Sequence, residues 1–245
     1  MRKVLGYVFA IIFILAGWEI TALLLDNAAL PGPFEAIPMV VTYFDDIWPA
    51  FLVSLYRVVV AMCIGTVLAI PLGLVCGRSP RVDAVFAPVL YFLYPLPKVV
   101  LLPVLIVLLG LADAPKITLI ALTIFFQVLV TVRDAAQSVP EESVMSMRSL
   151  GAKRWDIYRH VIVPATLPEL FTALRISSGT AVAILFFAES IAGSTGLGYF
   201  IVDSWALLAY PKMFAGIIAM AFLGVILYEI FDIAERKLTR WRVRN

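Results

Sequence analysis

The chain has 245 residues, of which 62% are hydrophobic and only 15% are charged, and its mean hydropathy is +1.00. An ordinary soluble domain carries about 25% charged residues and has too little interior to hide so much apolar surface. These numbers exclude an ordinary soluble protein, and we expect a lipid bilayer around the chain and no nucleic-acid partner. Unpaired backbone groups cost several kcal/mol in hydrocarbon, so the spans must be helices or a closed barrel. Long continuous apolar runs favour helices.

Six apolar segments approach the ~20 residues that cross a ~30 Å hydrocarbon core. They cover residues 4–25, 54–77, 85–111, 117–132, 169–192 and 213–234. We therefore expect an all-α, polytopic fold with six transmembrane helices in a single domain over residues 1–245. The first segment is too long for the core of a signal peptide and lacks a cleavage pattern of small residues, so we interpret it as a membrane helix.

Positive charges predict the orientation of these segments. Most of the 19 Lys and Arg residues lie at the two termini and in the gaps after the second and fourth segments: Arg2, Lys3, Arg78, Arg81, Arg133, Arg148, Lys153, Arg154, Arg159, Arg236, Lys237, Arg240, Arg242 and Arg244. By the positive-inside rule, both termini are then cytoplasmic. The remaining cations are expected at or inside span ends, where long side chains reach the interface: Arg57, Lys98, Lys116, Arg175 and Lys212.

The first outer loop is expected over residues 26–53. It contains Leu30-Pro31-Gly32-Pro33, a turn that leads into an amphipathic segment over residues 34–44. The apolar side of this segment would consist of Ile37, Val40, Val41 and Phe44. We expect the segment to lie on the outer surface of the membrane.

Prolines interrupt the third segment. Pro95 and Pro97 remove two backbone donors within Tyr94-Pro95-Leu96-Pro97-Lys98 and disfavour helical geometry at the residues before them. In lipid, such a break persists only where protein or a watery cavity satisfies the backbone. A packing kink and a break that lines a solute path are both open, so Pro95 and Pro97 are candidates for the path.

The longest polar interval, residues 133–168, separates the fourth and fifth segments. Ser138-Val139-Pro140-Glu141 fits a capping box and predicts a helix from Ser138 to Leu150, which Gly151 ends. A second short helix is expected from Ala152 to about Ile162, where Pro164 stops it. Large apolar side chains recur near the helical period along this pair, between basic ones: Met147, Leu150, Trp155, Tyr158 and Ile162.

Two interpretations of this interval are open. An amphipathic helix that rests on the anionic inner leaflet also uses Trp, Tyr and basic residues. The position between two spans and the bend at Gly151 favour instead a hairpin that enters a groove on a soluble partner. Aromatic and Arg side chains supply most of the binding energy at such interfaces.

The hairpin sequence resembles a known signature. Ser149-Leu150-Gly151-Ala152, followed by Val161-Ile162-Val163-Pro164-Ala165-Thr166-Leu167-Pro168, is similar to the EAA signature of ABC importer permeases. Further motifs resemble the nitrate, sulfonate, taurine and bicarbonate type of permease: Trp18-Glu19, Leu30-Pro31-Gly32-Pro33, Ser54-Leu55-Tyr56-Arg57, Pro71-Leu72-Gly73, Pro95-Leu96-Pro97, Ala188-Glu189 and Thr195-Gly196-Leu197-Gly198. Ser146-Met147-Arg148 departs from the family pattern of Glu-Ala-Ala or Glu-Ala-Arg. It stays open whether Arg148, Glu141 or Glu142 replaces the acidic contact.

The resemblance implies a type I (MetI-like) importer permease in a bacterial plasma (inner) membrane, a translocation subunit and not an enzyme. Residues 133–168 would be the cytoplasmic coupling loop, which contacts an ATP-binding subunit through Met147, Arg148, Leu150, Gly151, Ala152, Arg154, Trp155, Tyr158 and Pro164. Expected partners are two ATP-binding subunits, a second permease copy and an external solute-binding protein. The solute would be a small anion such as nitrate, sulfonate, taurine or bicarbonate.

Cofactor and metal binding are not expected on this chain. It contains no Gly-x-x-x-x-Gly-Lys-Ser/Thr loop, so ATP and Mg²⁺ are expected on the partner subunit. Its single histidine, His160, argues against a multi-histidine metal centre.

The fifth segment supplies further candidates for the solute path. A helical wheel places five of its residues on one stripe: Arg175, Ser178, Val182, Phe186 and Glu189. Snorkelling or pairing with a neighbouring helix better explains Arg175, whereas Glu189 is open to a role in the path or to an interhelical hydrogen bond. In the last segment, Asp232 and Arg236 have i, i+4 spacing and indicate a solvated helix end together with Glu235.

Two other classes of function are weighed against the importer. An ion-coupled secondary transporter would use Glu189 and Arg175 but gives no role to the Gly151 hairpin. An intramembrane enzyme lacks a convincing catalytic pair.

Overall fold

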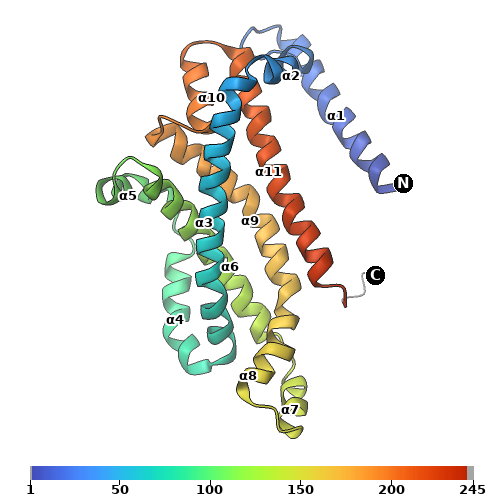
Figure 1. The fold of residues 1–245 in the computed structure, drawn as a ribbon, viewed down its shortest axis with the longest axis vertical. Helices are drawn as coiled ribbons and strands as arrows, with labels where there is room; N and C mark the ends of the chain where they lie inside the picture. The colour runs from blue at the N-terminus through green and yellow to red at the C-terminus, as the bar shows by residue number, and fades with distance from the viewer. Residues whose placement is uncertain (1, 242–245) are drawn as a thin grey trace. The chain divides into compact units, whose positions relative to one another are not determined.

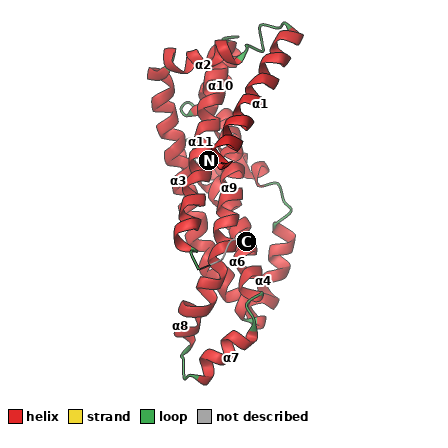
Figure 2. Cartoon of the chain, turned by 90° about the vertical axis from the view of Figure 1, so that its right-hand side faces the viewer, coloured by secondary structure: helices red, strands yellow, loops and turns green. Residues whose placement is uncertain are grey.

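The structure is a computed structural model that describes residues 2–241, and all regular structure in this range is helical (Figure 2). The predicted all-α fold is therefore confirmed. Arg242 and Arg244 of the predicted charge pattern lie outside the described residues. The helices, labelled in Figure 1, are α1 Arg2–Leu25, α2 Pro33–Thr42, α3 Phe44–Arg78, α4 Pro80–Leu93, η1 Lys98–Leu101, α5 Leu102–Leu109, α6 Asp113–Gln137, α7 Glu141–Ser149, α8 Arg154–Ile157, η2 Tyr158–Ile162, α9 Val163–Ala192, α10 Leu197–Ala206 and α11 Tyr210–Leu238.

Four helical runs are long and apolar enough to cross a membrane: α3, α6, Arg154–Ala192 and α11. The bent pair of α4 with η1 and α5 makes a fifth if it is counted as one span. In α1, residues Phe9–Leu25 form a shorter apolar helix. Six spans therefore remain a prediction. The fourth segment, predicted over residues 117–132, lies in a longer helix of 25 residues, Asp113–Gln137.

The chain divides into two compact units. One consists of Met1–Ser54 with Glu189–Phe222, and the other of Leu55–Ala188 with Leu223–Asn245. Helices α3, α9 and α11 contribute residues to both units.

In the first unit, Trp18 connects α1 to two other elements. Its ring stacks on Phe214 of α11 with 5.5 Å between centroids, and its indole N–H donates to the Pro31 carbonyl at 2.9 Å. Helix α2 then forms where an amphipathic segment was predicted. Its buried residues are Pro33 and Ala36, while Val41 of the predicted apolar side is 79% exposed.

In the second unit, α3 packs closely on α6 through glycines. A Cβ added at Gly65 would lie 2.6 Å from the Ala121 carbonyl oxygen, and one added at Gly77 would lie 2.5 Å from that of Arg133. Small residues allow helix backbones to approach in membranes, where van der Waals packing and hydrogen bonds supply the association energy. The two helices therefore form a tightly packed pair.

The predicted interruption of the third segment is confirmed. Helix α4 ends at Leu93, and the chain resumes as η1 and α5 with an axis bent by 84°. Pro95 and Pro97 lie in the break and are exposed. The two prolines prevent continuation of the α4 hydrogen-bond ladder.

We predict that Gly65→Ala lowers the free energy of unfolding by about 1–3 kcal/mol, because the added methyl group overpacks the contact between α3 and α6. Thermal unfolding in detergent measures the change. Gly179→Ala is the control, because Gly179 is exposed and has no atom within 4 Å of its added Cβ. Equal melting temperatures for the Gly65 variant and the unmodified chain would contradict the close packing.

Candidate functional site

The polar interval folds into a hairpin, residues 138–162, built from α7 and the start of the next long helix. Helix α7 begins at Glu141, not at Ser138 as predicted. Helix α6 extends to Gln137, and the Ser138 hydroxyl donates to the Ala135 carbonyl at 2.9 Å. The capping-box prediction was therefore wrong, because this serine lies at the end of α6 and its hydroxyl is used there.

Gly151 ends α7, as predicted. Its φ of +80° lies in the left-handed region, which favours glycine. The amide of Ala152 donates to the Met147 carbonyl at 3.1 Å, and that of Gly151 donates to Arg148 at 2.9 Å. These bonds satisfy carbonyl groups that the helix end would otherwise leave unpaired.

The second arm of the hairpin does not stop at Pro164. Helix α8 continues through the π-helix η2 into α9, so Arg154–Ala192 is one helical run. The Val163 amide donates to the Tyr158 carbonyl, five residues back, and Pro164 follows this change of bonding register. Proline has no N–H to donate within a helix, and the π-turn shifts the hydrogen-bonding register just before Pro164, so the helix continues past it. The predicted stop at Pro164 was therefore wrong. The second arm is thus the N-terminal part of the helical run that contains the fifth apolar segment.

The side chains of the hairpin divide between two environments. Val144, Ile157 and Ile162 are buried, whereas Leu150 and Trp155 are 83% and 72% exposed. Of the apolar side chains that recur along the hairpin, Ile162 therefore packs inward, while Leu150 and Trp155 are exposed. Of the other predicted contact residues, Met147, Ala152, Tyr158 and Pro164 are half-buried, and Arg148, Gly151 and Arg154 are exposed.

Arg78, the last residue of α3, connects the hairpin to the helix pair. One guanidinium nitrogen lies 3.4 Å from the Ala136 carbonyl oxygen and 3.3 Å from that of Val139. The other donates to the Glu141 carboxylate at 2.7 Å. Arg78 therefore bonds both to the C-terminal end of α6, where cations are favoured, and to the first residue of α7.

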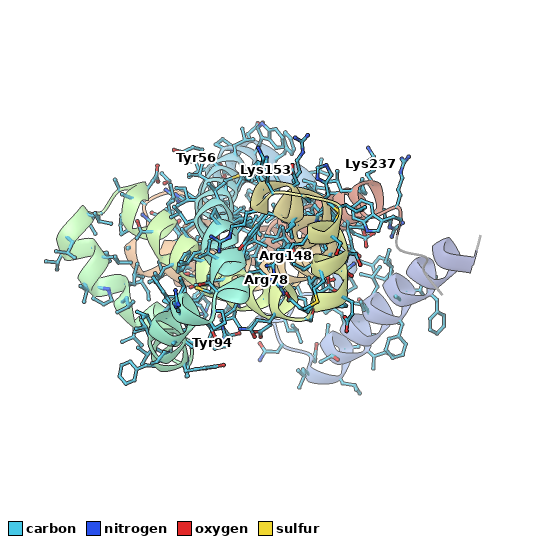
Figure 3. The ribbon with its side chains drawn as sticks, turned by 90° about the horizontal axis from the view of Figure 1, so that it is seen from below. Tyr56, Arg78, Tyr94, Arg148, Lys153 and Lys237 are labelled. Atoms are coloured by element: carbon cyan, nitrogen blue, oxygen red, sulfur yellow. The ribbon has the colours of Figure 1, made fainter. Side chains whose placement is uncertain are left out.

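A polar cavity of about 420 Å³ lies beside this contact, and Arg78, Asp83, Glu141 and Arg148 are among its lining residues. Figure 3 shows Arg78 and Arg148 near each other on the lower face. Glu141 is held by Arg78, whereas Arg148 makes no ion pair within the described part of the chain. Arg148, which belongs to the stretch that departs from the family signature, is therefore an exposed cation at a polar cavity.

Arg133 holds α4 against α6 on the same side. Its guanidinium donates to both carboxylate oxygens of Asp83, one of them at 2.7 Å, and lies 5.7 Å from the ring centroid of Tyr91. A bidentate pair of this kind fixes orientation as well as distance. The start of the broken span is thereby attached to the helix that leads into the hairpin.

Arg175 pairs with the neighbouring helix α11, which was one of the two predictions for it; the other was snorkelling. Its guanidinium lies 2.9 Å from Asp232 and 3.1 Å from Glu235. Arg236 also contacts Asp232 at the predicted i, i+4 spacing. Asp232 and Glu235 are only 6% and 8% exposed, so the prediction of a solvated helix end was wrong: Arg175, distant in the sequence, buries both carboxylates.

Glu189 lies near the C-terminal end of α9 and is fully buried, with its carboxylate beside the start of α10. Its carboxylate accepts hydrogen bonds from the Ser54 hydroxyl and from the Gly198 amide, each at 2.8 Å. The Ser54 oxygen in turn accepts from the Leu197 amide at 2.8 Å. A carboxylate at a helix N-terminus is favourably placed, and these bonds agree with the hydrogen-bond alternative for Glu189.

The other stripe residues show no common cavity. Ser178 is buried and donates to the Arg175 carbonyl at 2.7 Å, while Val182 and Phe186 are half-buried. Their role in a solute path stays a prediction. Helix α10, whose N-terminus Glu189 and Ser54 bond, was not predicted from the sequence. The glycine at position 196, with φ of +103° just before the helix, was the available signal.

The comparisons with known proteins decide the class. Residues 69–240 match the family described as binding-protein-dependent transport system inner membrane component. The chain belongs to this family. It is an ABC transporter permease, a translocation subunit and not an enzyme, and the secondary-transporter alternative has no support. Membership places the chain in a membrane transport system with ATP-binding subunits and a solute-binding protein.

Two relatives match over nearly the whole chain. The taurine transport system permease protein TauC of Escherichia coli (strain K12) is 31% identical over 91% of this chain and 84% of that protein. The putative aliphatic sulfonates transport permease protein SsuC of Bacillus subtilis (strain 168) is 30% identical over 94% of this chain and 84% of that protein.

The fold is also found in solved structures. A chain of the inward-facing MetNI methionine ABC transporter matches with a TM-score of 0.64 at 20% identity, over 82% of this chain and 98% of that one. The predicted type I, MetI-like permease fold is confirmed.

We predict that Arg78→Gln loosens α7, because the variant loses the ion pair with Glu141. Hydrogen exchange should become about tenfold faster at the amides of residues 141–149, as expected for loss of a charged hydrogen bond that is partly open to solvent. Arg81→Gln is the control, since Arg81 is exposed and without an ion pair among residues 2–241. Equal exchange rates in the two variants would show that Arg78 does not hold the hairpin.

Proposed function

We propose that this permease, with a second copy of itself, imports a small sulfonate such as taurine, driven by ATP hydrolysis on two separate subunits. The names of TauC and SsuC support the solute class, and the two relatives are similar to this chain to nearly the same degree. The second copy is inferred from the resemblance stated above.

The hairpin is the proposed contact for the ATP-binding subunits. Leu150 and Trp155 project from it as large exposed apolar side chains, and aromatic anchors of this kind suit a groove on a partner. Arg148 and Arg154 are exposed on the same hairpin. An acidic rim on the partner would complement them, in place of the acidic contact that the family usually makes from the permease.

One observation carries the coupling mechanism: α8 continues through η2 into α9. A partner that displaces Trp155 therefore moves the end of a membrane-spanning helix directly. A hinge between the hairpin and the membrane would instead absorb that displacement. Coupling of two sites requires an element whose states both sites bias, and the run Arg154–Ala192 is the proposed element.

We propose that the hairpin faces the cytoplasm, and this sets the orientation of the chain in the membrane. The positive-inside rule supports a cytoplasmic position for residues 133–168 and for both termini. The predicted outer loop, residues 26–53, contains α2 and the start of α3 in the structure. In this orientation it faces the external solute-binding protein together with the turn before α10.

Reconstitution tests this function. Proteoliposomes that contain the permease, its ATP-binding subunits and the solute-binding protein should accumulate taurine or an alkanesulfonate only when ATP is hydrolysed. Uptake by the permease alone along an ion gradient would contradict the proposal.

We predict that Trp155→Asp or Gly151→Pro abolishes most ATP-driven uptake, by about tenfold or more, while the protein still inserts into the membrane. Aspartate removes the apolar anchor, and proline cannot adopt the positive φ of Gly151. Uptake and ATP hydrolysis are measured in the same vesicles.

Trp241→Asp is the matched control, because Trp241 is also exposed but lies outside the hairpin. Normal uptake per ATP in the Trp155 and Gly151 variants would remove the coupling role from the hairpin.

A further inference from the structure

The five cations that the sequence places at or inside span ends differ in how their charge is balanced. Arg57 pairs with Asp113, Arg175 with Asp232 and Glu235, and Lys212 with Asp46. The Lys116 ammonium donates to two backbone carbonyls at 2.9 and 3.1 Å. Lys98 is the one among these five that has a single carbonyl and no carboxylate within the described residues.

Lys98 lies at the break of the third segment, as the first residue of η1. Its ammonium donates to the Tyr94 carbonyl just after α4 and lies 5.2 Å from the ring centroid of Tyr94 and 5.1 Å from that of Phe126. An ammonium group has three N–H donors, so two remain for another acceptor. Cation–π contacts hold the charge in place without neutralising it.

Lys98 lies within the third apolar segment predicted from the sequence, residues 85–111, and it is half-buried. Helix α4 rises about 20 Å between Arg81 and Tyr94, which is most of a ~30 Å hydrocarbon core. The ammonium also bonds back to Tyr94, so the side chain is not extended towards a surface. An intramembrane cation with no carboxylate partner among the described residues is a candidate functional position, and broken helices are where transporters bind solutes.

We infer that Lys98 binds the transported solute and that the site selects a small organic anion. This inference rests on the proposed function, which supplies a sulfonate or related anion as the missing partner. The sulfonate oxygens would accept the two remaining N–H donors, while the rings of Tyr94 and Phe126 form an apolar wall. The Pro95-Leu96-Pro97 turn lacks two amide donors, which makes the ammonium the main donor at the break.

Substitution of Lys98 tests the inference through the charge of the solute. Lys98→Gln should raise KM for taurine or ethanesulfonate uptake by about ten- to a hundredfold, the range for losing a charged hydrogen bond. Lys98→Arg keeps the charge and should restore most of the affinity. The melting temperature should change little in either variant.

Lys212→Gln is the matched control, because Lys212 also lies over two aromatic rings but is paired with Asp46. Its KM should match that of the unmodified permease. Equal KM values for the Lys98 and Lys212 variants, with a lower melting temperature for Lys98→Gln, would overturn the inference and leave Lys98 as a cap on α4. A loss of permease dimers in Lys98→Gln would also overturn it, since a carboxylate of the second copy would then be the partner.

The same vesicles separate this inference from the proposed function. If uptake proceeds without ATP, the importer proposal fails regardless of Lys98. If ATP-driven uptake is intact and Lys98→Gln leaves anion affinity unchanged, only the Lys98 inference fails. If the permease carries another anion and Lys98→Gln raises its KM, the sulfonate assignment fails and the anion site stands.

Discussion

The guanidinium of Arg78 is the contact on which the position of the hairpin depends. It leaves the end of α3 and bonds at once to carbonyls at the end of α6 and to Glu141 at the start of α7. Because α3 and α6 approach through Gly65 and Gly77, the base of this contact is a closely packed helix pair. The first arm of the hairpin is therefore fixed to a rigid base, while the second arm is the start of a membrane helix. In the proposed coupling mechanism, a force on the hairpin tip would act on α9 relative to that base.

Charge balance separates structural groups from candidate solute contacts. Arg133 with Asp83, and Arg175 with Asp232 and Glu235, are close pairs that hold α4 on α6 and α11 on α9. Removing one partner of such a buried pair is costly, so these residues stabilise the helix arrangement. Lys98 differs because its ammonium contacts two rings and one carbonyl, and no carboxylate among residues 2–241 pairs with it. The proposed anion site therefore follows from the contrast with its paired neighbours.

The sequence predicted what local pattern determines: the long apolar helices, the break at Pro95 and Pro97, and the stop at Gly151. It failed where a residue's partner is distant or the helix register changes. Asp232 was assigned to solvent because its partner Arg175 is 57 residues away. The predicted helix end at Pro164 was wrong because no sequence pattern announces the π-turn over Tyr158–Ile162, which lets the helix continue. Helix α10 was missed because it is short and starts beside a buried carboxylate, Glu189, which only the tertiary fold brings there.

The most direct test of the account is where the ATP-binding subunit touches this chain. A photo-crosslinking amino acid is placed at Leu150, at the tip of the hairpin, and separately at Phe34 in α2; the two side chains are 83% and 81% exposed. In the assembled transporter, the account predicts crosslinks to the ATP-binding subunit from position 150 and none from position 34, which should reach only the outer side. Crosslinks to that subunit from position 34, or their absence from position 150, would contradict both the orientation and the coupling role of the hairpin.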